Sequence, residues 1–169
     1  MRIKQLLLSI HKTFIRIPSW SFIFIMVLSK YILLIMLMPL FIFMPYQGEI
    51  RGPSIIYESP VFAIVLSVLI APIFETFLFQ KSILRLTRKI GYMKERIWLQ
   101  IFISAFVFGL FHWYSLIYIL QGVLLGLVFA YSYTVFEHKN SSPIWNVVCI
   151  HGIGNLISMI IYYLDSGII

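Results

Sequence analysis

Long apolar runs alternate with short polar connections along most of the chain. Each run is long enough to cross the hydrocarbon core of a bilayer as a helix, which takes about 20 residues. The runs predict about five membrane-spanning helices, at roughly Trp20–Met44, Pro60–Gln80, Ile97–Tyr114, Leu116–Phe136 and Pro143–Leu164. The predicted fold is therefore all-α, a polytopic membrane helix bundle.

Composition also places the chain in a membrane. Of its 169 residues, 61% are hydrophobic and 11% are charged, whereas a soluble domain is about half apolar and about a quarter charged. We expect residues 1–19 to be a cytoplasmic segment suited to the membrane interface, and residues 20–169 to form a single transmembrane domain. Cys149 is the only cysteine, which excludes an internal disulfide and a cysteine-based metal cluster.

Basic residues are concentrated in two of the polar segments. The N-terminal tail and the 81–96 connection are strongly basic, whereas the 45–59 connection carries Arg51 with Glu49 and Glu58. The positive-inside rule then predicts an integral membrane protein whose N-terminus is cytoplasmic. The net charge of +7 fits contact with the lipid bilayer rather than nucleic acid, because no DNA- or RNA-binding module is present. Nothing in the sequence specifies an oligomeric state.

Polar residues inside the apolar runs are the candidate functional groups, because such residues usually face a bundle interior or a water-filled cavity. They are Lys30, Glu75, Gln80, His112, His151 and Asn155. Glu75 follows Pro72, which lacks a backbone N–H and is expected to kink the helix and free the carbonyl of Val68. Thr76 and Gln80 are four residues apart, so they can hydrogen-bond to each other; the alternative is a neutral pair on the helix surface.

The two histidines each have a predicted neighbour on the same helix face. Phe108 lies four residues before His112, and Asn155 lies four residues after His151. Alternatively, His112 is an interfacial residue, and His151 with Asn155 is an interhelical hydrogen-bonded pair. Small residues accompany both sites: we expect Gly122 and Gly126 to pack helices closely, and Gly152 and Gly154 to admit another helix or a substrate backbone.

A carboxylate, two imidazoles and a carboxamide in one pocket suit hydrolysis of an acyl bond. The carboxylate can act as a general base on water, and imidazole or carboxamide N–H groups can stabilise an oxyanion. No serine or cysteine is placed as a nucleophile beside either histidine. The alternative is a zinc site formed by Glu75, His112 and His151 with an open position for water, although the HExxH spacing is absent.

Three motifs together resemble the CPBP family, the CAAX protease and bacteriocin-processing group of intramembrane proteases. That family carries EExxxR, FxxxH and HxxxN motifs. In this chain FGLFH at 108–112 and HGIGN at 151–155 match the second and third, and ETFLFQ at 75–80 stands at the first. Thr76 replaces the second glutamate and Gln80 replaces the arginine, so a neutral pair takes the place of an ion pair. The resemblance covers about residues 60–164.

The resemblance implies an all-helical endopeptidase in a bacterial cell membrane, with a cavity reached from the cytosol and a CAAX-like or bacteriocin-like peptide or protein substrate. The implied catalytic residues are Glu75, His112, His151 and Asn155, supported by Thr76, Gln80 and Phe108. Glu75 with His112 would activate water, and His151 with Asn155 would stabilise the oxyanion. One alternative is a non-proteolytic membrane protein that uses the same pocket for bacteriocin immunity or scaffolding. A small transporter is disfavoured because no internal repeat is evident.

Overall fold

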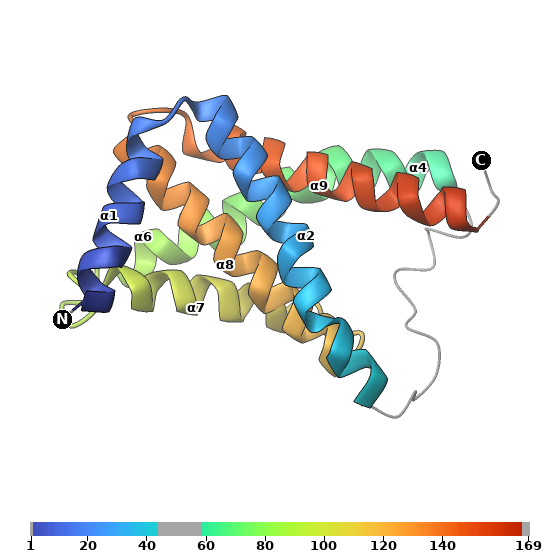
Figure 1. Ribbon diagram of the computed structural model, residues 1–169, viewed down its shortest axis with the longest axis horizontal. Helices are drawn as coiled ribbons and strands as arrows, with labels where there is room; N and C mark the ends of the chain where they lie inside the picture. The colour runs from blue at the N-terminus through green and yellow to red at the C-terminus, as the bar shows by residue number, and fades with distance from the viewer. Residues whose placement is uncertain (1, 44–58, 167–169) are drawn as a thin grey trace.

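The computed structural model describes residues 2–43 and 59–166, and these residues form a helical bundle without strands (Figure 1). The elements are α1 (Arg2–Arg16), α2 (Ser19–Phe43), α4 (Pro60–Val65), η1 (Leu66–Ile70), α5 (Ala71–Glu75), η2 (Thr76–Ser82), α6 (Ile83–Thr87), α7 (Ile97–Leu110), α8 (Leu116–His138) and α9 (Pro143–Asp165). Elements α4 to α6 form one continuous helix, in which η1 and η2 are π-helical. The predicted all-α membrane bundle is confirmed.

Four stretches are long and apolar enough to cross a membrane: Ser19–Pro39, Pro60–Thr87, Leu116–His138 and Pro143–Asp165. The predicted third span, Ile97–Tyr114, was too long, because α7 has 14 residues and ends at Leu110. The chain turns there, and Ser115 begins the next helix by accepting a hydrogen bond from the Tyr118 N–H at 3.1 Å. Met44, the predicted end of the first span, and the residues Glu49, Arg51 and Glu58 lie outside the described residues.

Helix α8 is the centre of the bundle and packs against α1, α2, α7 and α9 (Figure 1). Its contact with α7 is made by small residues. A Cβ added to Gly126 would lie 2.7 Å from the Ala105 Cα, and one added to Gly122 would lie 2.9 Å from the Gly109 Cα. The predicted packing role of Gly122 and Gly126 is confirmed, because no larger side chain fits between these backbones.

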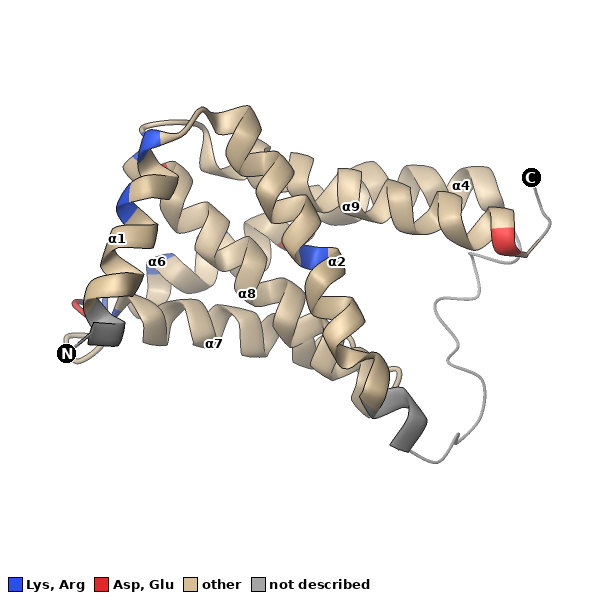
Figure 2. Cartoon of the chain, viewed as in Figure 1, with Lys and Arg blue, Asp and Glu red and all other residues tan. Residues whose placement is uncertain are grey.

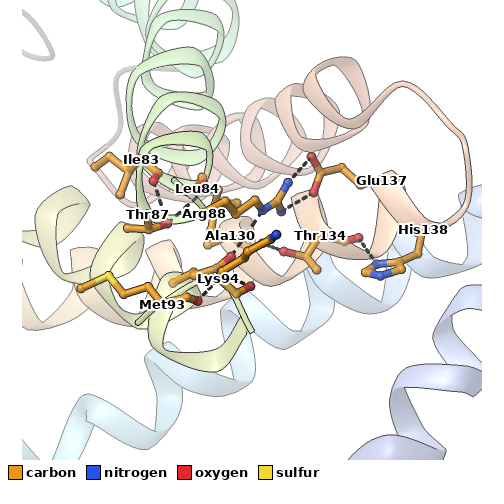
Figure 3. A network of polar contacts seen from close by, with 11 residues as sticks. Ile83, Leu84, Thr87, Arg88, Met93, Lys94, Ala130, Thr134, Glu137 and His138 are labelled. Carbon is orange, nitrogen blue, oxygen red and sulfur yellow. Dashed lines mark hydrogen bonds and ion pairs between the residues drawn. The ribbon is translucent and has the colours of Figure 1, made fainter. Parts of the chain in front are cut away.

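An ion pair fixes the connection between α6 and α7 to the end of α8 (Figure 3). The Arg88 guanidinium donates to both carboxylate oxygens of Glu137, at 2.9 and 2.5 Å, and its Nε donates to Gln100 at 3.3 Å. The hydrogen bonds to the Glu137 carboxylate raise the pKa of Arg88 above its ordinary value. Charged residues gather on α1 and around this connection, at one end of the bundle (Figure 2). The bundle thus has one polar end beside long apolar helices.

Candidate active site

A cavity of about 610 Å³ lies between α2, the helix from η1 to η2, the ends of α7 and α8, and α9. Its lining includes all four predicted catalytic residues: Glu75, His112, His151 and Asn155. These residues come from three separate parts of the chain, and Phe108 joins them in the wall. Thr76 and Gln80 are not among the lining residues. The structure therefore brings the predicted catalytic residues together and leaves two of the predicted supporting residues behind the wall.

Glu75 is the last residue of α5 and faces His151 across the cavity. The His151 Nε2 lies 3.7 Å from a Glu75 carboxylate oxygen, which is an electrostatic contact and too long for a hydrogen bond. The Glu75 side chain is 24% exposed and that of His151 is 6% exposed. The Phe129 ring stacks on the imidazole, with ring centroids 4.3 Å apart. His151 is therefore held rigidly, while the carboxylate keeps access to the cavity.

His112 lies in the turn just after α7, and its protonation pattern follows from its partner. Its Nδ1 is 2.8 Å from the carbonyl oxygen of Phe108. A carbonyl only accepts hydrogen bonds, so Nδ1 carries the hydrogen and Nε2 of the neutral ring keeps its lone pair. The ring is thus an acceptor at Nε2, and the predicted same-face relationship with Phe108 is confirmed.

The Phe108 ring lies between the two imidazoles. Its centroid is 4.5 Å from that of His112 and 6.1 Å from that of His151. The ring is 1% exposed and makes a further edge contact with Phe129 at 5.7 Å. Phe108 therefore sets the spacing of the two histidines by packing, and its backbone carbonyl sets the orientation of one of them.

The orientation of the Asn155 carboxamide is fixed by two obligatory partners. Its Oδ1 accepts from the Lys30 ammonium at 3.1 Å, and its Nδ2 donates to the Ser67 carbonyl at 2.9 Å. Because an ammonium only donates and a carbonyl only accepts, the amide cannot be flipped. Within the described part of the chain, one of the two hydrogens on Nδ2 remains free for a ligand.

The free carbonyl of Ser67 results from Pro72. In the π-helical segment η1, the Ala71 N–H donates to the Leu66 carbonyl, five residues earlier. The same spacing pairs the Ser67 carbonyl with residue 72, which is a proline without an N–H. The predicted effect of Pro72 is thus present, but the carbonyl that gains a side-chain partner is that of Ser67 rather than Val68. The prediction assumed a regular α-helical register, and the π turn shifts it by one residue.

Gly152 and Gly154 allow these close contacts, as predicted. A Cβ on Gly152 would lie 2.5 Å from the Val68 carbonyl oxygen, and one on Gly154 would lie 2.8 Å from the Lys30 side chain. Gly152 therefore lies against the backbone of a second helix, and Gly154 lies against a lysine side chain. The backbone of α9 therefore approaches both η1 and α2, which closes the cavity on this side.

Lys30 is the polar residue whose place in the site the sequence did not predict. Its side chain is buried, with the residue 3% exposed, and it lines the cavity beside Asn155. The feature of the sequence that could have indicated this place is a lysine in the middle of an apolar run. Burying its charge in a bilayer is energetically unfavourable unless the side chain faces the bundle interior. The sequence did not indicate which other helix it would contact.

The predicted hydrogen bond between Thr76 and Gln80 is wrong, and so is the alternative of a surface pair. Both residues are 0% exposed, and the Thr76 hydroxyl and both polar atoms of the Gln80 amide have no hydrogen-bond partner in the described part of the chain. Both lie in η2, where the turn follows i→i+5 spacing instead of the i→i+4 spacing that the prediction assumed.

In the described part of the chain, the zinc alternative lacks a complete ligand set. Within residues 2–43 and 59–166, no three His, Cys, Asp or Glu side chains are grouped so that they could hold a metal ion. Glu75 and His151 approach each other, but His112 does not complete a ligand set with them.

Comparison with known proteins shows which family the chain is similar to. A family model described as Type II CAAX prenyl endopeptidase Rce1-like matches residues 57–157, which is more than half of the chain. The matched range contains the four predicted catalytic residues: Glu75, His112, His151 and Asn155. No curated protein and no solved structure matches the chain.

Proposed function

Because the chain belongs to the Rce1-like family of type II CAAX prenyl endopeptidases, we propose that it hydrolyses a peptide bond inside the membrane by means of a glutamate-activated water. The observation that carries this proposal is the convergence of Glu75, His112, His151 and Asn155 on one cavity. A carboxylate, two imidazoles and a carboxamide supply both a proton acceptor and hydrogen-bond donors, which is what hydrolysis requires.

Glu75 is the general base and His112 orients the water. The Nε2 lone pair of His112 accepts one water hydrogen, because Nδ1 is already committed to the Phe108 carbonyl. The Glu75 carboxylate takes the other proton as the water oxygen attacks the scissile carbonyl carbon. A positioned general base contributes about 10²- to 10⁴-fold to such a step.

His151 and Asn155 stabilise the oxyanion that this attack creates. The free Nδ2 hydrogen of Asn155 and an Nε2–H of His151 are the available donors, and the fixed carboxamide needs no reorientation. A single oxyanion donor contributes about 10²- to 10³-fold. When the intermediate collapses, the C–N bond breaks and Glu75 returns its proton to the leaving amine nitrogen.

The substrate is a membrane-associated peptide or protein of the CAAX-like or bacteriocin-like kind, reached from the cytosol. Basic residues on α1 and around the α6–α7 connection (Figure 2) support a cytoplasmic location for both segments. Apolar side chains of Leu78, Phe79 and Leu125 in the cavity lining suit a substrate with an apolar or lipidated portion.

The test uses the full-length protein in proteoliposomes with a farnesylated peptide ending in a CAAX motif, and mass spectrometry to detect products. Wild type is expected to cleave, and Glu75→Gln is expected to lose about 10²- to 10⁴-fold in kcat/KM. Glu95→Gln is the matched control, because this exposed carboxylate lies outside the cavity. Activity should persist after exhaustive chelation. Activity retained by Glu75→Gln would exclude the proposed base, and a wild type that binds peptides without cleaving them would favour immunity or scaffolding.

A further inference from the structure

We propose that Lys30 recognises the free C-terminal carboxylate of the substrate, so that the cavity selects peptide ends over internal segments. This inference rests on the proposed function, because it names the part of the peptide that the same cavity binds. It assigns a binding role to a residue of α2, which lies outside the residues matched by the family model.

The first argument is that the Lys30 charge lacks a counterion. The residue is 3% exposed, and in the described part of the chain its ammonium is within 4 Å of no carboxylate. Its side-chain hydrogen bond goes to the neutral oxygen of Asn155, at 3.1 Å. A buried ammonium is costly unless it is paired, and two of its three hydrogens remain available for an anionic ligand.

The second argument is the distance from the candidate general base. Asn155, which contacts Lys30, lies one turn along α9 from His151, and the His151 Nε2 is 3.7 Å from Glu75. Side chains one turn apart on a helix, such as His151 and Asn155, are separated by about 6 Å. The contact of His151 with Glu75 and that of Asn155 with Lys30 therefore place the carboxylate and the ammonium at neighbouring positions along the cavity. In a CAAX motif the terminal carboxylate is three residues beyond the prenylated cysteine. Three extended residues span about 10 Å, so a terminal carboxylate held by Lys30 is expected to place the bond after the prenylated cysteine about that far away, on the Glu75 side of the cavity.

The third argument is the chemistry of the two ends of the cavity. Lys30 and the Ser158 hydroxyl belong to the end formed by α2 and α9, whereas Tyr114 and Tyr118 gather around His112. A peptide whose terminus binds Lys30 therefore directs its upstream, lipid-bearing part toward the aromatic end. At the Lys30 end the ammonium is the donor for a carboxylate, because the Ser158 hydroxyl already donates to the Gly154 carbonyl, and the other end offers rings for an apolar group.

The experiment compares a free-acid peptide with the same peptide carrying a C-terminal amide. Wild type should prefer the free acid by about 10- to 100-fold in kcat/KM, mainly through KM, as expected for loss of one charged hydrogen bond. Lys30→Met should lose this preference, Lys30→Arg should keep most of it, and Lys12→Met, an exposed lysine on α1, should keep all of it.

Binding to Glu75→Gln, measured by thermal shift in detergent with both peptides, separates this inference from the proposed chemistry. A preference for the free acid in that variant, lost in Glu75→Gln with Lys30→Met, supports the role of Lys30 even if no cleavage is ever detected. If Lys30 had a purely structural role, its replacement would leave unchanged the ratio of binding between the free-acid peptide and the amide peptide. Equal binding of both peptides by Glu75→Gln, or an equal preference in Lys30→Met, would overturn the inference. If Lys30→Met does not fold, Lys30→Gln replaces it, because glutamine can still donate to Asn155 but carries no charge: loss of the preference for the acid supports the inference, and an unchanged preference overturns it.

Discussion

Pro72 should control the orientation of Asn155 through a hydrogen bond that proline cannot make. In Pro72→Ala, residue 72 gains an N–H five residues after Ser67, and this N–H can compete with Asn155 for the Ser67 carbonyl. The bond at risk is the neutral hydrogen bond of 2.9 Å from Asn155 Nδ2. Such a bond contributes about 0.5–1.5 kcal/mol, so kcat/KM should fall by roughly 2- to 12-fold. The helix itself should gain stability, because alanine is up to about 3 kcal/mol more favourable than proline in a helix interior.

The assay combines peptide cleavage with thermal unfolding in detergent. Pro72→Ala should melt at the same or a higher temperature while its activity falls, and this opposite movement is the signature of lost orientation rather than lost folding. In a double-mutant cycle with Asn155→Leu, the effect of Pro72→Ala on activity should largely disappear. Pro143→Ala, at the start of α9, serves as a control outside the cavity. Unchanged activity in Pro72→Ala, or fully additive effects in the cycle, would refute the reasoning.

Two further predictions concern packing and pH. Gly152→Ala should lower both the melting temperature and the activity, because its Cβ would lie 2.5 Å from the Val68 carbonyl oxygen; the expected loss of stability is about 1–3 kcal/mol. Gly91→Ala is the control and should change neither, because nothing lies within 4 Å of its Cβ. Equal melting temperatures of the two variants would contradict this prediction. Burial, and then the neighbouring His138, lower the pKa of His11 below its usual 6.5, so protonation favours the unfolded state and stability is lost as pH falls below about 6.5. Melting curves between pH 7.5 and 5.5 should therefore shift more in wild type than in His11→Gln, and parallel shifts would contradict it.

The sequence predicted those features that depend on spacing along one helix. Apolar runs of sufficient length gave the bundle, and the i, i+4 relationships placed Phe108 beside His112. Small residues at Gly122 and Gly126 predicted where helices approach, because only a missing side chain allows such contact. The meeting of Glu75, His112 and His151 in one cavity came from the costs of burying polar groups in a membrane and from the family resemblance.

The features that the sequence did not predict depend on helix register and helix pairing. A π turn shifts hydrogen bonds by one residue, so the free carbonyl moved from Val68 to Ser67, and Thr76 and Gln80 lost the pairing expected of an α-helix. The early end of α7 depends on the turn that leads into Ser115. Lys30 was visible as an intramembrane cation, but its contact with Asn155, 125 residues later, requires knowledge of which helices pack together.

Gly122 links the close contact of α7 and α8 to the chemistry of the cavity. A Cβ added to Gly122 would lie 2.9 Å from the Gly109 Cα and 3.3 Å from the His112 Cβ, and Gly122 also lines the cavity. In a random mutagenesis screen, inactive variants at this position would therefore resemble losses of a catalytic group, although glycine contributes no functional atom. For an engineer who wishes to widen the cavity, the consequence is that the wall near His112 cannot be enlarged from this helix.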